Sequence, residues 1–323
     1  MSKPRRVKRH RQIPCQATRA TERVPSAQTL YRFALIDDET RRLVDEAGKA
    51  LEPEIRARDE KAVQQIKSAP TAEAVLDLAR LATGLGESAW QARMRQFGPE
   101  VVLLISQRLK NVRAICDEQE RDIVTEQLIA ALRWKGQAGA QVLLECFGLL
   151  DEYGQSLVCI VLGLLQVKSA ADMLWSFYQK AKDNRRENNF VGALSGLIDL
   201  EDERVPGALA DLLRQGRDYY EMYGFLSRAG DAQTVALLVR KSVRLPENEK
   251  YEALLALTSI GHRIGREALL AEFSKMPATN STPQTREAVA DSLFSQPASV
   301  AKEYFGLYYR RPGLVPDARN HTG

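Results

Sequence analysis

Residues 138–166 read AGAQVLLECFGLLDEYGQSLVCIVLGLLQ, and this stretch decides the fold class. In its first half, apolar side chains follow Leu143 at three, four and seven residues, which is the spacing of one face of an α-helix. A polar joint, Asp151-Glu152, comes next, and the second half is apolar from Leu157 to Leu165 apart from one glycine. The strict apolar-polar alternation typical of a half-buried strand is missing. The stretch therefore predicts two helices joined by a short turn.

The same rhythm continues on both sides of this stretch. From Ala69 onward, helical runs of roughly 12–16 residues alternate with short polar, Gly or Pro joints. No segment shows convincing strand alternation, so the sequence predicts an all-α protein. The predicted helices are 71–83, 87–96, 99–111, 118–134, 138–150, 153–166, 168–182, 187–199, 203–214, 218–228, 231–244, 247–261, 264–275, 283–294 and 298–309.

Two kinds of helix alternate along the chain. The first kind carries an early small apolar residue before Leu-rich spacing, as in ERVPGALADLL, and the second ends in a Leu/Ala/Gly motif, as in GALSGLIDLED. The early small residues of the first kind are Val75, Val102, Val142, Ala171, Val205, Val235, Ala268 and Val300. Their separations are 27, 40, 29, 34, 30, 33 and 32 residues, a period of about 32.

Such repetition predicts an α-solenoid of stacked antiparallel helix pairs. A single pair cannot cover its own apolar face, whereas stacked pairs share one continuous core. Small residues in the second kind of helix, such as Gly163 and Gly196, should let neighbouring helices approach closely.

The pairing of xxxVxxLLxxL with xALxxLG(D) resembles HEAT repeats, especially the short prokaryotic HEAT-like kind. The resemblance covers residues 70–309 and is clearest in 138–276. It implies a right-handed superhelical scaffold that binds proteins, and sometimes nucleic acid, along an inner surface. The repeat motif identifies a fold and not an activity.

The chain is expected to have four parts. They are a basic disordered tail at 1–26, charged N-terminal helices at 27–68, the repeat array at 69–309 and a C-terminal tail at 310–323. Pro53 lies within the charged helical segment and should kink it or divide it into two helices. Residues 1–24 hold eight Lys or Arg and one Glu, which leaves 38 basic and 41 acidic side chains elsewhere. The net charge of +4 therefore comes from the tail, and the solenoid itself is slightly acidic.

Several classes of function find no support in the motifs. Of three histidines only His262 lies in the array, and HExxH, GxSxG, GxxxxGK[ST] and GxGxxG are all missing, so no metal, cofactor or catalytic activity is expected. His262 follows Ile260-Gly261 at an expected helix end, where it should cap carbonyls. Cys146 and Cys159 are expected to be small buried apolar residues.

The sequence also favours a cytoplasmic protein without a membrane span. No stretch reaches the roughly 18 uninterrupted apolar residues that a span requires. The basic N-terminus is not followed by the apolar region of a secretory signal.

A binding role is therefore favoured, with the first kind of helix assigned to the concave side. Outward positions on these helices and on the joints after them, together with Tyr220 of an aromatic cluster on the helix 218–228, form a candidate partner site that is basic in its middle. Its residues are Trp175, Lys180, Arg214, Arg217, Tyr220, Arg240, Lys241 and Arg244. A cationic trough of this kind would hold an acidic protein segment or a phosphate backbone. The alternative is an ordinary solvated helix face.

The leading interpretation is a non-catalytic scaffold or adaptor that binds a protein partner on the concave face, in an oligomeric state that the sequence leaves open. The first alternative is a nucleic-acid-associated protein whose tail and basic row follow phosphates. The tail residues concerned are Lys3, Arg5, Arg6, Lys8, Arg9 and Arg11, for which a purely solubilising role is the other possibility. The second alternative is a HEAT-like enzyme such as a bilin lyase or a DNA glycosylase. Asp172 and Trp175 are candidate parts of such a site, although no motif joins them.

One aromatic cluster has a structural interpretation. Tyr304, Phe305, Tyr308 and Tyr309 lie close to the end of the array. A terminal repeat must cover its last apolar face, so these rings are expected to cap the open end.

Overall fold

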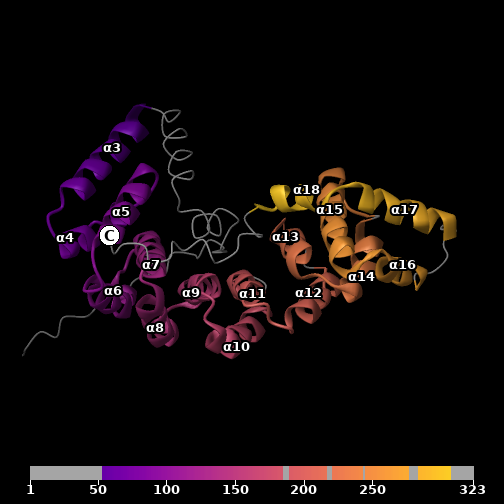
Figure 1. The fold of residues 1–323 in the computed structure, drawn as a ribbon. Coiled ribbons are helices and arrows are strands. Elements are labelled where there is room, and N and C mark those ends of the chain that lie inside the picture. Colours follow the sequence, from indigo (N-terminus) through magenta and orange to yellow (C-terminus); the bar gives the residue numbers. More distant parts are fainter. Residues whose placement is uncertain (1–52, 185–188, 217–219, 243, 276–282, 307–323) are drawn as a thin grey trace, which may run out of the picture.

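A computed structural model describes residues 53–184, 189–216, 220–242, 244–275 and 283–306. Every regular element in these ranges is a helix, which confirms the all-α class. The helices pack as an arch of two rows, an inner row along the concave side and an outer row along the convex side (Figure 1).

The inner row consists of the second kind of helix and a first helix that precedes the array. Its members are α3 (Pro53–Ser68), α5 (Leu85–Gln96), α7 (Glu118–Arg133), α9 (Glu152–Leu164), α11 (Phe190–Asp199), α13 (Tyr220–Ala229) and α15 (Glu247–Ile264). Each packs against the next, so the row is continuous.

The outer row consists of the first kind of helix. Its members are α4 (Ala72–Asp77), α6 (Val101–Lys110), α8 (Gly136–Cys146), α10 (Ala171–Ala181), α12 (Val205–Arg214), α14 (Ala232–Ser242) and α16 (Arg266–Ser274). Short 3-10 helices occupy several joints, at η1 (Ala79–Leu81), η2 (Val112–Ala114), η3 (Phe147–Leu149) and η4 (Lys168–Ala170). At the C-terminal end, α17 (Pro283–Ser295) packs on α15 and α16, and α18 (Ala298–Tyr304) packs on α15.

Local sequence explains where these helices begin. Asp117 caps α7 by accepting from the backbone N–H of Glu120 at 2.7 Å, and Asp151 caps α9 in the same way. Pro53 is the first residue that the structure describes, so the kink or break expected there falls at the edge of the described range and stays a prediction. Most predicted and observed boundaries agree within a few residues, but the predicted helices 71–83, 138–150 and 168–182 are each divided into an α-helix and a short 3-10 helix. The predicted helix 298–309 extends past α18 into residues outside the described ranges.

Glycines explain the close packing of the inner row. A Cβ on Gly163 of α9 would lie 2.5 Å from the Cα of Gly196 on α11, and a Cβ on Gly196 would lie 2.2 Å from the carbonyl oxygen of Cys159. Backbones approach this closely only where no side chain intervenes. The outer helices α8, α10 and α12 are spaced further apart, so the arch closes toward the inner row.

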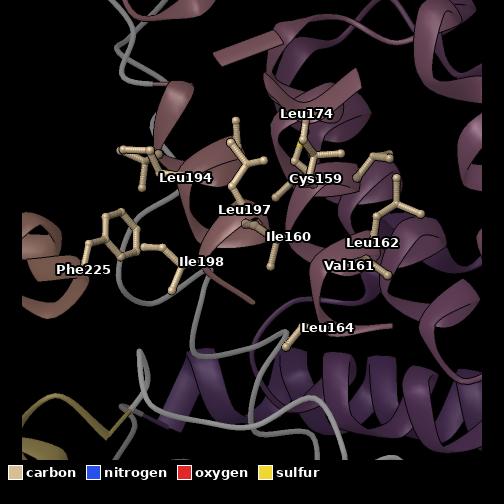
Figure 2. Close-up of a cluster of buried hydrophobic side chains, with 14 of the residues drawn as sticks. Cys159, Ile160, Val161, Leu162, Leu164, Leu174, Leu194, Leu197, Ile198 and Phe225 are labelled. Atoms are coloured by element: carbon tan, nitrogen blue, oxygen red, sulfur yellow. The ribbon is translucent and has the colours of Figure 1, made fainter. Parts of the chain in front are cut away.

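The core lies between the two rows. Figure 2 shows its middle, where side chains of α9 and α11 meet Leu174 of α10 and Phe225 of α13. Cys159 and Cys146 are fully buried, as the apolar patterns predict. Burial raises the pKa of both thiols, because it disfavours the thiolate.

Candidate functional site

The structure places the candidate partner residues on the outer row, and the expectation that the first kind of helix lines the concave side is not met. Trp175 and Lys180 lie on α10, Arg214 ends α12, and Arg240 and Lys241 lie on α14 (Figure 1). The glycine contacts explain the difference, because they belong to the second kind of helix and bring that row closest together.

The remaining candidates have no common location in the structure. Arg244 follows α14 and is exposed. Arg217, the side chain of Tyr220 and the tail residues from Lys3 to Arg11 lie outside the residues described.

Trp175 and Asp172 are joined through a third residue, Arg204. The guanidinium of Arg204 lies 5.0 Å from the centre of the Trp175 ring and 2.9 Å from Asp172 Oδ1. It also pairs with Asp202 at 2.6 Å, and these hydrogen bonds raise the pKa of Arg204. The contacts tie α10 to the start of α12 and account for the half-buried indole.

The basic row is partly neutralised by neighbouring acids. Lys180 Nζ lies 3.5 Å from Glu152, and Arg214 lies 2.5 Å from Asp211 on the preceding turn of α12. Both pairs are at the surface, where such pairs contribute little to stability.

A buried ionic cluster lies on the inner row, where sequence reasoning placed no site. Asp199 ends α11, and its Oδ1 lies 2.8 Å from Nη1 of Arg228 on α13; the two side chains are only 3 % and 15 % exposed. Burial raises the pKa of Asp199, while Arg228 and the nearby Arg133 of α7 oppose that rise. The sequence contained one indication of this cluster. Asp199 is an acid in the last turn of an apolar helix, where the negative end of the helix dipole is unfavourable for it unless a cation lies nearby.

Cationic side chains cap the C-terminal ends of several inner helices. Lys135 Nζ donates to the Phe97 carbonyl at the end of α5 at 2.6 Å, and Arg263 donates to the Gly230 carbonyl just beyond α13 at 2.5 Å. Lys168 does the same at the end of α11. Positive charge near unpaired helix carbonyls is favourable, so these contacts connect neighbouring repeats. Burial lowers the pKa of Lys135, because it disfavours the ammonium form.

His262 also contacts a carbonyl, although not at the end of its own helix. Its Nε2 lies 2.9 Å from the carbonyl oxygen of Gln296, just beyond α17, and its ring packs 4.9 Å from that of Phe294. The histidine therefore ties α15 to α17.

Exposed apolar side chains gather at the C-terminal end of the arch. Of seven exposed large hydrophobic residues among those described, Tyr251, Leu254 and Tyr304 lie together on α15 and α18, which we call the terminal patch. The rings of Tyr251 and Tyr304 are 5.6 Å apart and nearly perpendicular, and Tyr304 donates to Glu252 Oε1 at 3.0 Å. Phe305 is buried beneath, as expected of a cap, but Tyr304 remains 42 % exposed. Tyr308 and Tyr309 lie outside the described ranges.

A groove of about 320 Å³ lies at the other end of the arch, between α3 and α5. Val63, Leu85 and Ala89 contribute apolar surface to it, and Glu60 and Lys67 contribute charged groups. The groove contains no histidine or cysteine.

Among the described residues, no cluster of His, Cys, Asp and Glu has the arrangement of a metal site. None of the helices in the described ranges combines the length and the apolar character needed to cross a membrane. No family model, no curated protein and no solved structure matches this chain.

Proposed function

We propose that the protein is a non-catalytic scaffold of HEAT-like repeats, located in the cytoplasm, that binds a protein partner through the terminal patch. The gathering of Tyr251, Leu254 and Tyr304 on one surface carries the proposal. The basic row nominated from the sequence supports it less well, because two of its members are paired with acids.

The composition of the terminal patch suits protein recognition. Tyrosine offers a large rigid contact area with a polar hydroxyl, and it is enriched among residues that dominate binding energy. Contiguous exposed apolar surface is uncommon on soluble proteins and often marks an interaction site. The partner expected from this chemistry is a protein segment with apolar side chains that covers the two tyrosines and Leu254.

The test compares two double variants of the full chain in affinity capture followed by mass spectrometry. Tyr251→Ser with Leu254→Ser removes two of the three side chains of the terminal patch, while Leu103→Ser with Leu149→Ser removes two exposed apolar side chains from α6 and η3. Loss of about 1.4 kcal/mol or more of binding energy should reduce capture of a specific partner at least about tenfold in the first variant only. Retention of the same partners by both variants, at unchanged melting temperatures, would contradict the proposal.

A second candidate function, phosphate binding, rests on Arg240 and Arg244. Both side chains are exposed, and within the described part of the chain neither has an ion-pair partner. Retardation of nucleic acid at about 50 mM salt, lost in Arg240→Glu with Arg244→Glu and steeply reduced by added salt, would support this function. No retardation of the unaltered protein would exclude it under those conditions.

A further inference from the structure

The groove between α3 and α5 is formed by one stripe of side chains from each helix. The α3 stripe consists of Glu60, Val63, Gln64 and Lys67. The later residues follow Glu60 by three, four and seven positions, which is the spacing of a single helix face. The α5 stripe, from Leu85 to Ala92, has the same spacing. None of the described lining residues is buried, so the surface between the two stripes is accessible.

The two helices run parallel to each other. At the start of α5, the backbone N–H of Leu85 donates to Asp59 of α3 at 3.3 Å. At the other end, Arg93 of α5 donates to the carbonyl of Ala69, just beyond α3, at 2.9 Å. The two stripes therefore lie side by side in the same direction. Each rises by about 10 Å from its first residue to its last, so the groove is about two helical turns long.

The floor of the groove suits a closely packed helix. Ser88, Ala89 and Ala92 are the small residues of the α5 stripe, and Val63 and Leu85 add larger apolar side chains. Small side chains let the backbone of another helix approach, and larger ones beside them fit between its side chains. An extended peptide would leave backbone N–H and C=O groups unpaired against this floor, because an α-helix pairs its own backbone groups and offers no free edge. A bound helix has no such groups to pair.

The two ends of the groove carry opposite charges. Glu60 lies at the end where α5 begins, and Lys67 lies in the last turn of α3. Glu60 pairs with Arg56 at 2.9 Å, and both side chains are exposed. Within the described part of the chain, the side chains of Lys67 and Gln64 make no hydrogen bond or ion pair. Lys67 therefore offers a cation without a counter-charge at one end of the groove.

We propose that this groove binds an amphipathic α-helix of a partner protein, oriented antiparallel to α3 and α5. Both helices have their C-terminal ends at the Lys67 end, and their negative dipole ends favour the positive N-terminus of the bound helix there. Acidic residues in the first turn of that helix pair with Lys67, and basic residues in its last turn lie beside Glu60. Its apolar residues, three, four and seven positions apart, cover Val63, Leu85 and Ala89. Side-chain charge and helix dipole thus select the same orientation.

This docking site is separate from the terminal patch. α3 and α5 lie at one end of the arch, and α15 and α18 lie at the other (Figure 1). A partner helix in the groove leaves the terminal patch accessible, so the protein can bind two partners at once, one at each end.

The test uses the full-length protein and a designed helical probe, the C-terminally amidated peptide SDEELAKLLAKLKK with fluorescein at its N-terminus. Its leucines repeat the spacing of the groove, with acidic residues before them and lysines after them. The control peptide, SKKKLAKLLAELED, has the same composition and the same leucines, with the charges exchanged. Fluorescence anisotropy should show saturable binding of the probe, at least fivefold tighter than binding of the control. Absence of saturable binding, including the case in which another part of the chain or a second copy fills the groove, would overturn the proposal.

Three variants distinguish the groove from non-specific binding. Lys67→Glu should shift the preference at least fivefold toward the control peptide, and this shift does not depend on helicity because the same two peptides are compared. Ala92→Gln fills the floor and should weaken probe binding at least tenfold. Ala288→Gln, exposed on α17, should leave it unchanged. Melting temperatures verify that all three variants fold. An unchanged preference in Lys67→Glu, or equal affinities in the two glutamine variants, would contradict the proposal.

Photo-crosslinking locates the bound probe. Photo-leucine in place of its two central leucines should yield crosslinks to peptides of α3 and α5. Crosslinks to α15 or α18 in their place would overturn the proposal and leave the function proposed for the terminal patch standing. The variant Tyr251→Ser with Leu254→Ser should bind the probe as tightly as the unaltered protein does, so failure at one end of the arch is distinguishable from failure at the other.

Discussion

The two rows of the arch are held together by different kinds of interaction. In the inner row, Gly196 allows backbone contact, and Asp199 pairs with Arg228 away from water. In the outer row, Arg214 pairs with Asp211 at the surface, where both side chains are more than half exposed. A buried charge that loses its counter-charge has no water to replace it, and tightly packed backbones have no room for an added side chain. At the surface, water replaces a lost contact. Stability is therefore expected to depend on the inner row far more than on the outer row.

The largest effect is expected from removing the buried acid. Asp199→Ala leaves the charge of Arg228 largely buried without its carboxylate, which should lower the free energy of unfolding by about 3 kcal/mol. Urea unfolding at pH 7, followed by circular dichroism, measures this change. Asp211→Ala is the matched control in the outer row, and equal losses in the two variants would remove the distinction between the rows.

A single methyl group tests the close packing directly. In Gly196→Ala the new Cβ would lie 2.2 Å from the Cys159 carbonyl oxygen, so α9 and α11 must separate, at an expected cost of about 2 kcal/mol. Gly207→Ala is the control, because this glycine of α12 has no atom within 4 Å of the added Cβ. That variant should be more stable by about 0.5 kcal/mol, since alanine restricts the unfolded chain. Thermal melting of both proteins measures the difference, and destabilisation by both would contradict the comparison.

The sequence predicted the helices and their stacking because both depend on local patterns. Apolar spacing located each helix, and the glycines of the second kind indicated close approach, which Gly163 and Gly196 confirm. The choice of concave row failed for a physical reason. Both kinds of helix bury an apolar face, so the apolar pattern does not distinguish the two rows. The direction of curvature depends on the spacing between helices of neighbouring repeats, and the sequence of a single helix does not encode that spacing.

The sequence patterns also did not predict the ionic contacts between repeats. Asp199 and Arg228 lie on successive inner helices, and Asp172 and Arg204 lie in neighbouring repeats, each pair roughly one repeat length apart. A search for opposite charges at that separation would have suggested both pairs. The Asp199–Arg228 pair is buried and the Asp172–Arg204 pair is partly exposed. This difference depends on how the rows pack and is not encoded in the spacing of the charges.

Two aspartates three residues apart should respond to pH in opposite directions. Arg204 holds the pKa of Asp202 below its ordinary value. The ionised Asp202 therefore adds to the free energy of unfolding above the unfolded-state pKa, and this contribution is lost as pH falls through the folded-state pKa. Burial raises the pKa of Asp199, so protonation of this carboxyl adds an increment of stability that is full below the unfolded-state pKa and is lost as pH rises through the folded-state pKa; the ion pair with Arg228 is a separate contribution. Carboxyl NMR titration should therefore find Asp199 titrating at higher pH than Asp202. The reverse order would mean that Arg228 outweighs burial at the inner site.

The smallest effect is expected in the outer row. Arg214→Ala removes a pair whose side chains are 53 % and 62 % exposed, so the free energy of unfolding should change by less than about 0.5 kcal/mol. The change in the free energy of unfolding should be equally small at high salt, because solvent already screens a pair this exposed and added salt has little left to weaken. Urea unfolding at low and high ionic strength measures both values. A loss of more than about 1 kcal/mol would show that the convex surface carries structural charge pairs as well. A change in the free energy of unfolding near zero would mean that the fold does not require Arg214, so that its charge is available to bind a partner.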